Sequence, residues 1–179
     1  DLLQSVRSNG ALITAFQVSN PQDFGVVAFN KDGEVTSLEE KPRLPKSNYA
    51  VPGIYFYDST VAGRAKKLKK SIRGELEITD VNKFYLHHKK LNVVPLPRGF
   101  AWLDTGTHDS LLDAAGFIAT LQKRQGLMVA CPEEIAFRQG WITAESVQKV
   151  AAQLSKNSYG QYLNKILLEM QQGKPPSLT

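Results

Sequence analysis

Runs of apolar residues with few polar interruptions predict several strands in the first part of the chain. One run covers residues 11–18, and two more, at 24–30 and 34–41, flank the turn residues Asp32 and Gly33. Two β-type runs around an Asp-Gly pair are typical of a β-hairpin. Three further strands are expected at 53–58, 91–96 and 100–104. This part of the chain is therefore expected to form a sheet.

Helical periodicity follows some of these strands and dominates the end of the chain. Thr79 and Asp80 are good N-cap candidates, because the apolar residues after them recur with the i, i+3, i+4, i+7 spacing of one helical face. Gly106 and Thr107 are expected to open another helix. From Pro132 onward no segment is typical of a strand. The expected helices cover 2–9, 60–70, 81–88, 107–124, 133–139, 144–154 and 159–171.

These elements indicate an α/β protein with two parts. Residues 1–128 are expected to form a domain around a mixed sheet, and residues 129–179 a helical C-terminal subdomain. The length of 179 residues agrees with one main domain and a small appendage. Because the chain does not begin with Met and opens with no signal region, we expect it to be a piece of a longer protein.

The composition excludes several classes of protein. Apolar residues make up 42% of the chain and charged residues 22%, which argues against disorder. No apolar run reaches the roughly 18 residues that a membrane span needs. The single cysteine, Cys131, cannot form an internal disulfide, and this predicts a cytoplasmic protein. No histidine is spaced with Cys131 as zinc ligands would be.

A basic run contributes to the net charge of +5. Five of the seven residues from Arg64 to Lys70 are Lys or Arg. Such a run fits either a nucleic-acid patch or a solvated helix face. No aromatic platform or recognition motif accompanies it. We therefore interpret it as a solvated face and expect no nucleic acid among the partners.

Two short segments carry residue types that suit the chemistry of a sugar phosphate. Glu40 and Lys41 lie where a hairpin strand ends before Pro42. A carboxylate accepts hydrogen bonds from sugar hydroxyls, and an ammonium neutralises a phosphate. Asp104 precedes Gly106 at the expected end of a strand, where open α/β sheets bind ligands and Mg²⁺. The pattern alone fits a solvated strand end and a turn-capping aspartate as well.

Gly25 and several aromatic residues are weaker candidates. A strand glycine lets a ligand approach the backbone closely, although a β-bulge is the commoner reason for one. The residues Tyr49, Tyr55, Tyr57 and Trp102 suit the wall of a sugar site. Most aromatic residues of buried strands, however, belong to the core.

Five segments, taken in order, resemble the sugar nucleotidyltransferase family and, within it, the glucose-1-phosphate thymidylyltransferases. These segments are 24–27 (FGVV), 38–42 (LEEKP), 48–57 (NYAVPGIYFY), 74–80 (GELEITD) and 102–107 (WLDTGT). The likeness continues through 132–139 and 159–163 and covers about residues 3–168. The helical tail is the part that points to the thymidylyl branch.

The resemblance implies a Rossmann-like nucleotidyltransferase sheet and a reaction. Glucose 1-phosphate attacks the α-phosphorus of dTTP in line and pyrophosphate leaves, which gives dTDP-glucose in the first step of dTDP-L-rhamnose synthesis. Such catalysis consists mostly of positioning and charge neutralisation. The implied partners are these two small molecules, with Mg²⁺ as cofactor, in a cytoplasmic homotetramer that feeds lipopolysaccharide O-antigen synthesis.

The resemblance also assigns roles to residues. The implied substrate-binding residues are Gly25, Glu40, Lys41, Val51, Tyr55 and Trp102. Glu40 would hold sugar hydroxyls, and Lys41 would hold the phosphate of glucose 1-phosphate. Asp104 would ligate Mg²⁺, so that Lys41 and Asp104 are the implied catalytic residues. The family usually has Tyr where Phe24 stands, and this difference removes a hydroxyl from the site.

In the same way, Gly25 and Val51 would bind the sugar through their backbones, and Tyr55 and Trp102 would line its pocket. The family has in addition a second, regulatory nucleotide site near a subunit contact. The residues that match it are Arg98, Gly99, Glu134, Ile135, Arg138 and Gln139. The alternative for these positions is a helix surface or a contact between subunits.

The family pattern also implies parts that this sequence lacks. About 120 N-terminal residues are expected to be missing, among them the Gly-rich loop that cradles a triphosphate. The chain alone is therefore expected to be inactive. Two other interpretations stay open: a nucleotidyltransferase of the same fold that uses UTP or another sugar phosphate, and a non-catalytic module that binds nucleotide sugars.

Overall fold

The computed structural model describes residues 9–172 of the chain. The chain forms two compact units, which meet in sequence between Trp102 and Leu103. The helix end expected at 2–9 lies outside the described residues. The boundary expected between residues 128 and 129 concerns folding domains and stays a prediction.

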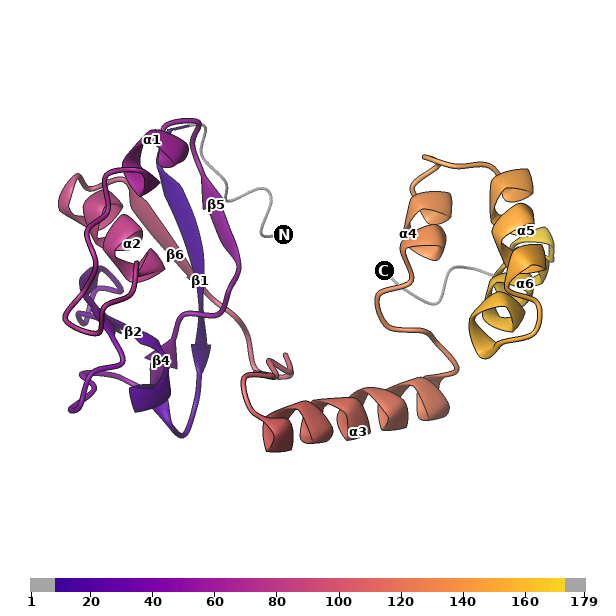
Figure 1. The fold of residues 1–179 in the computed structure, drawn as a ribbon, viewed down its shortest axis with the longest axis horizontal. Coiled ribbons are helices and arrows are strands. Elements are labelled where there is room, and N and C mark those ends of the chain that lie inside the picture. The colour runs from indigo at the N-terminus through magenta and orange to yellow at the C-terminus, as the bar shows by residue number, and fades with distance from the viewer. Residues whose placement is uncertain (1–8, 173–179) are drawn as a thin grey trace. The chain divides into compact units, whose positions relative to one another are not determined.

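The first unit is built on a six-stranded mixed sheet (Figure 1). Its strands are β1 (Ala11–Gln17), β2 (Gly25–Phe29), β3 (Val35–Glu40), β4 (Tyr49–Ala50), β5 (Tyr55–Tyr57) and β6 (Leu91–Pro95). Strand β1 is central, because it pairs parallel with β6 and antiparallel with β4 and β5. Its residues Ile13 and Ala15 are fully buried. The continuous apolar run that predicted this strand is thus explained by burial on both faces.

The predicted hairpin is confirmed. Strands β2 and β3 pair antiparallel, with Gly25 opposite Glu40 at the open end. At the closed end the side-chain oxygen of Asn30 accepts hydrogen bonds from the backbone N–H groups of Asp32 and Glu34. Gly33 supplies the positive φ of 80° that this turn requires.

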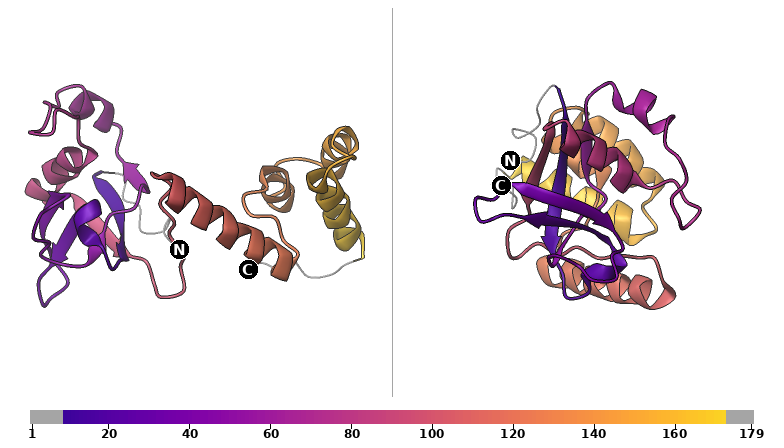
Figure 2. Two further views of the ribbon diagram at one scale, coloured as in Figure 1. Left: turned by 60° about the horizontal axis from the view of Figure 1, so that its bottom comes forward. Right: turned by 90° about the vertical axis from the view of Figure 1, so that its left-hand side faces the viewer.

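Helix α2 (Ile78–His87) packs on one face of the sheet (Figures 1 and 2). Val81 and Tyr85 are buried there against Ala11 of β1. The N-cap is Glu77, so the prediction of Thr79 or Asp80 was wrong by two or three positions. Thr79 lies inside the first turn of α2, and its hydroxyl donates a hydrogen bond to Glu40 at the end of β3.

The helix predicted at 60–70 is shorter than expected. A 3₁₀ turn, η2 (Pro21–Asp23), and the short helix α1 (Val61–Ala65) complete the first unit. Helix α1 contains Gly63 and has no side-chain N-cap hydrogen bond. The lysines that follow it repel one another, and both features disfavour extension of the helix.

The strand predicted at 100–104 is absent. Only an isolated bridge between Arg98 and Phe100 forms there, and residues 101–105 have no regular structure. The backbone turns instead, with the Phe100 N–H donating to Pro97 O and Gly99 at φ 100°. A proline and a left-handed glycine just before the apolar residues thus prevent a strand.

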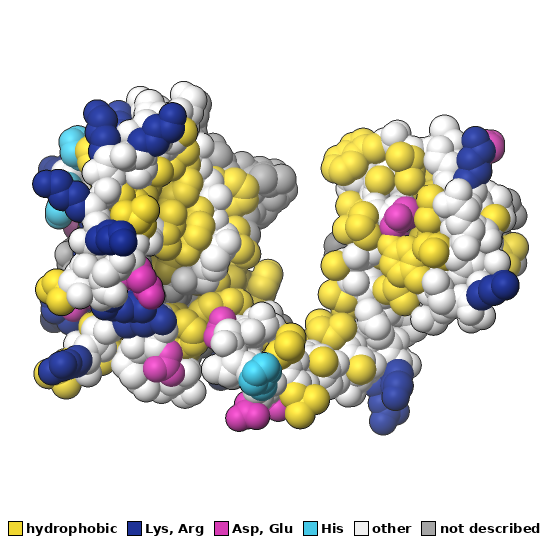
Figure 3. All heavy atoms as spheres, viewed as in Figure 1, with side chains coloured by type: hydrophobic (Ala, Val, Ile, Leu, Met, Phe, Trp, Pro, Cys, Tyr) yellow, Lys and Arg dark blue, Asp and Glu magenta, His cyan; other side chains and the backbone are white. Residues whose placement is uncertain are grey.

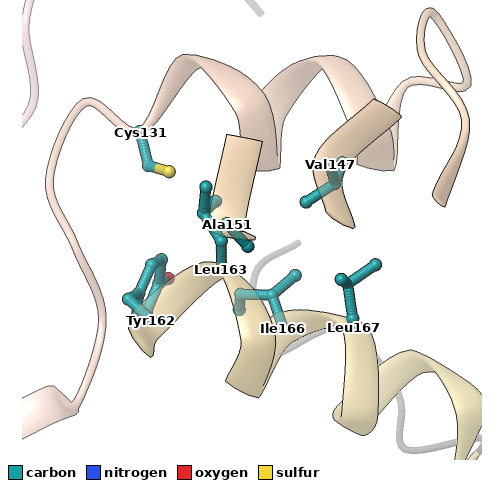
Figure 4. Close-up of a cluster of buried hydrophobic side chains, with 7 residues drawn as sticks. All are labelled: Cys131, Val147, Ala151, Tyr162, Leu163, Ile166 and Leu167. Atoms are coloured by element: carbon teal, nitrogen blue, oxygen red, sulfur yellow. The ribbon is translucent and has the colours of Figure 1, made fainter. Parts of the chain in front are cut away.

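The second unit is helical. It contains α3 (His108–Gln125), α4 (Pro132–Arg138), α5 (Ala144–Gln153) and α6 (Ser158–Gln171), which confirms the expected helices. Thr107 caps α3, because its hydroxyl accepts from the Ser110 N–H. The last three helices enclose a small core (Figure 4), formed by Cys131, Val147, Ala151, Tyr162, Leu163, Ile166 and Leu167.

Large apolar side chains remain at the surface of the first unit. Leu76 is 60% exposed and Phe100 is 55% exposed. Figure 3 shows hydrophobic side chains gathered over β1 and β5. No helix in the described part of the chain is both long and apolar enough to cross a membrane.

Close packing of α5 against α6 leads to a stability prediction. A Cβ at Gly160 would lie 2.2 Å from the Leu154 carbonyl oxygen and 2.9 Å from that of Ala151. We expect Gly160→Ala to lower the free energy of unfolding by about 1–3 kcal/mol, as overpacking does. The measurement is urea unfolding followed by circular dichroism.

The matched control is Gly116→Ala in α3, where a Cβ would meet nothing within 4 Å. That variant should be neutral or gain about 0.5–1 kcal/mol from helix propensity. Equal effects of the two substitutions would contradict the packing argument.

Candidate functional site

At the open end of the β2–β3 hairpin, the predicted site residues Gly25 and Glu40 meet Thr79 of α2. The Thr79 hydroxyl donates a hydrogen bond of 2.5 Å to Oε2 of Glu40. Gly25 lies opposite Glu40, and a Cβ there would come 3.1 Å from Thr79 Oγ1 and 3.2 Å from Glu40 Oε2. A side chain at position 25 would therefore crowd the carboxylate. Glycine at this position leaves room for the hydrogen bond between Thr79 and Glu40.

Charged residues surround Glu40 on its other side. Arg73 places Nη1 3.7 Å from Glu40 and 3.7 Å from Glu77, and Nη2 3.2 Å from Glu75. Glu77 is buried and accepts a 2.9 Å hydrogen bond from Ser71 Oγ. One guanidinium thus faces three carboxylates, which leaves a surplus of negative charge and of hydrogen-bond acceptors.

Thr79, Arg73 and Glu77 were not among the predicted site residues. Two of them lie in the segment 74–80, which the resemblance had singled out without giving these residues a role. Their separation from Glu40 along the chain is long, and no local spacing connects them.

Tyr55 on strand β5 is half-buried. Burial, and secondly the negative charge of Glu40, raise the pKa of Tyr55 above its ordinary value of 10.0. Its ring stacks on Tyr57 at 6.0 Å, as expected for two residues on one strand face. The Tyr57 hydroxyl donates to Asn82 Oδ1 at 2.6 Å. Tyr55 is therefore a neutral hydroxyl at physiological pH, within the electrostatic reach of Glu40.

Lys41 has an unusual backbone. Its φ is 41°, in the left-handed region that a non-glycine residue adopts at a cost of about 1–2 kcal/mol. Its N–H donates to Phe24 O at 2.9 Å, which ties it to the strand opposite. The ammonium is exposed, and no described residue pairs with it. A strained residue with a free cation is typical of a functional position.

Two further substrate-site candidates lie around the same strand ends. The Val51 N–H donates to Gly25 O at 2.8 Å, so this amide is already used within the sheet. Trp102 packs against Phe24, with ring centroids 4.8 Å apart. The first unit thus joins Gly25 to Glu40 and Val51, and the charge of Glu40 acts on Tyr55.

Asp104 belongs to the second unit and is exposed. Its Oδ2 accepts a long hydrogen bond of 3.4 Å from the Gly106 N–H. Such a long bond leaves both carboxylate oxygens available to a cation. No cluster of three or more metal-ligating side chains occurs among residues 9–172.

The residues predicted for a regulatory site fall in both units. Arg98 and Gly99 line a groove of about 500 Å³ in the first unit, together with Phe16, Tyr49 and Phe100. The others lie on or just after α4 in the second unit, where Ile135 is 51% exposed and Gln139 is also exposed.

Glu134 and Arg138 bind each other. Glu134 is buried, and its carboxylate accepts hydrogen bonds from the Tyr162 hydroxyl at 2.5 Å and from Arg138 Nε at 2.8 Å. Burial, and then the bond to Glu134, raise the pKa of Tyr162 to about 12. This network links α4 to α6, and it uses Nε of Arg138, while the terminal nitrogens of Arg138 have no hydrogen-bond or ion-pair partner among residues 9–172.

The basic run is mostly solvated. Lys66, Lys67, Lys69 and Lys70 are exposed. Arg64 is the exception, because its guanidinium lies 3.7 Å from the centre of the Phe84 ring and Nε donates to Thr60 Oγ1. The run is therefore mostly solvated, as interpreted, but its lysines follow helix α1 and do not form a helix face.

Comparison with known proteins identifies the class. The family model described as "Nucleotidyl transferase" matches residues 2–120, and the chain belongs to this family. Glucose-1-phosphate thymidylyltransferases from Mycobacterium tuberculosis and Xanthomonas campestris are 57% and 55% identical over 89% and 88% of the chain. The enzyme of that name from Neisseria meningitidis is 52% identical over 91%. The chain spans 53% to 57% of the length of these three relatives.

Solved structures agree with the fold. A putative glucose-1-phosphate thymidylyltransferase from Bacillus anthracis, in complex with a sucrose, superposes with a TM-score of 0.57 at 41% identity. The match covers 65% of this chain and 46% of that one. A UDP-glucose pyrophosphorylase at 20% identity and a TM-score of 0.53 covers 64% of this chain and supports the fold alone. The expected nucleotidyltransferase fold class is confirmed.

The position of Tyr55 leads to a titration prediction. Glu40→Gln removes a negative charge beside the phenol, so the pKa of Tyr55 should fall. It should stay above 10.0, because burial is the larger cause of the raised value. The measurement is ultraviolet difference titration of tyrosinate, with the signal of a Tyr55→Phe variant subtracted.

The control is Glu39→Gln, which removes the neighbouring charge that pairs with Lys46 at 2.5 Å. It should leave the Tyr55 titration where it was. A Tyr55 pKa that responds to both substitutions equally would sink the assignment to Glu40.

Proposed function

We propose that the chain is the sugar-phosphate-binding part of an enzyme that forms dTDP-glucose and pyrophosphate from dTTP and glucose 1-phosphate. The proposal is carried by one observation above all: a fixed carboxylate, Glu40, stands next to an exposed cation, Lys41, for which residues 9–172 offer no ion-pair partner, at the end of a hairpin. The identity of 52% to 57% to glucose-1-phosphate thymidylyltransferases supports the same reaction.

In this proposal a phosphate oxygen of glucose 1-phosphate attacks the α-phosphorus of dTTP. The bond from that phosphorus to the oxygen of pyrophosphate breaks in the same in-line displacement. Lys41 holds the attacking phosphate, and Glu40 accepts hydrogen bonds from sugar hydroxyls. Thr79 and Arg73 fix the carboxylate before the sugar arrives, so that little reorganisation is needed on binding.

The remaining substrate residues shape the pocket. The absence of a side chain at Gly25 lets a sugar approach the backbone next to Glu40. Because the Val51 N–H is bonded to the Gly25 carbonyl oxygen, Val51 would bind the sugar through its own carbonyl oxygen. Tyr55 supplies a neutral hydroxyl, and Trp102 supplies an apolar wall.

Asp104 is proposed as a metal ligand. Nucleotidyl transferases generally depend on a divalent metal. An exposed carboxylate with weakly engaged oxygens fits Mg²⁺, which is bound through one or two carboxylates and keeps water and phosphate ligands. When bound, the metal neutralises charge on the phosphates.

The wider setting follows from the same proposal. We propose that the enzyme acts in the cytoplasm, at the first step towards dTDP-L-rhamnose, as a homotetramer. Arg98, Gly99, Ile135, Arg138 and Gln139 would contribute to a regulatory nucleotide site. Glu134 would serve this site indirectly, because it is buried and holds Arg138.

The first test measures pyrophosphate release from dTTP, glucose 1-phosphate and Mg²⁺. It compares this chain with a form extended upstream to its natural start. We expect release only from the extended form, and faster with dTTP than with UTP. An extended form that is folded yet inactive with both nucleotides would favour a binding module.

Two variants of the extended form separate the proposed roles. Lys41→Ala should raise KM for glucose 1-phosphate by about tenfold or more, as loss of a charged hydrogen bond does. Asp104→Asn should lower kcat by about 100-fold or more with little change in stability, because the side chain is exposed.

The controls are Lys31→Ala at the hairpin turn and Asp109→Asn in the first turn of α3, both exposed. Neither should change turnover. Near-normal kcat in folded Asp104→Asn would remove the metal assignment, and an unchanged KM in Lys41→Ala would remove the phosphate assignment.

A further inference from the structure

Trp102 lies in a segment with no regular structure, yet its ring has two aromatic neighbours. Its indole lies 4.8 Å from the Phe24 ring, at 58° between the planes. On another side, the Phe16 ring meets it edge-on, with centroids 6.1 Å apart and planes at 75°. All three residues belong to the first unit.

The backbone does little to fix Trp102. Residues 101–105 form neither helix nor strand, and within the described chain no backbone hydrogen bond involves Trp102. Phe16, in contrast, is part of the central strand β1, where it is paired with Ala50 of β4. The two ring contacts are therefore what orient the indole, and the edge-on contact with Phe16 is the one made from the central strand, since edge-to-face aromatic pairs favour a defined geometry.

Open space lies beside Phe16. Its ring is one wall of the groove of about 500 Å³ that Tyr49, Arg98 and Phe100 also line. Removal of the ring would enlarge this groove. The indole would then lose its edge-on neighbour on that side.

We propose that Phe16 is a positioning residue for Trp102 and thereby sets the affinity of the pocket for the sugar phosphate. This inference rests on the proposed function, in which Trp102 lines the sugar pocket. Phe16 itself acts only through the indole. Its effect should therefore appear in substrate affinity and in the environment of Trp102, and not in the rate of the chemical step.

The chain offers a matched control. Phe29 is also half-buried, lies on strand β2, and meets Tyr49 edge-on with centroids 5.5 Å apart at 86°. It has no ring contact with Trp102. Phe29→Ala thus removes the same atoms in the same kind of contact, without touching the indole.

The first measurement is the fluorescence of Trp102. The chain has two tryptophans, and Trp141 of the second unit is 73% exposed, so Trp141→Phe leaves Trp102 as the single indole reporter. In this background Phe16→Ala should shift the emission to the red and increase acrylamide quenching about twofold or more. Phe29→Ala and Phe16→Tyr should resemble the parent. Identical emission and quenching in Phe16→Ala and the parent would overturn the inference.

The second measurement is steady-state pyrophosphate release by the form extended to its natural start. Phe16→Ala should raise KM for glucose 1-phosphate by about five- to tenfold with kcat within about twofold, and Phe16→Tyr should restore KM. An unchanged KM, or a rise matched by Phe29→Ala, would overturn the positioning role and leave the proposed function intact. Failure of the parent to release pyrophosphate at all would overturn the proposed function, and the inference with it.

Discussion

The candidate site depends on the absence of a side chain at position 25, which is a glycine. Gly25 leaves space at the open end of the hairpin, and in that space the Thr79 hydroxyl of α2 reaches the Glu40 carboxylate of β3. The contact joins a helix to the sheet and aims a carboxylate at the same time. Arg73 adds a cation on the other side, which compensates part of the cost of holding Glu40 in a largely buried place.

Short sequence patterns were sufficient to predict most helices and strands of the fold. The apolar run of β1 and the Asp-Gly turn of the β2–β3 hairpin act over a few residues, and so do the periodic apolar positions of α6. The strand expected at 100–104 failed because Pro97 and Gly99 turn the backbone just before it. The prediction of Thr79 as the N-cap of α2 was wrong for a different reason. Its hydroxyl donates to Glu40, which is far away in sequence.

The same distinction holds for the site. Glu40, Lys41 and Asp104 were found because their chemistry is visible in short motifs. Thr79, Arg73 and Glu77 were missed, because their roles arise only when α2 and the segment before it pack near the end of β3. Burial also changed one assignment: Glu134 matches a ligand position by motif, yet its carboxylate is occupied by Arg138 and Tyr162.

The place of β1 in the sheet has a consequence for how the protein is made. Ala11 pairs with Leu91, so the central strand must wait for about 80 further residues before its parallel neighbour is synthesised. Non-local pairing of this kind slows folding. During synthesis the apolar run 11–15 is exposed, with high β-propensity and no charge, and such segments aggregate readily. The nascent first unit therefore carries an unpaired apolar segment until β6 has left the ribosome.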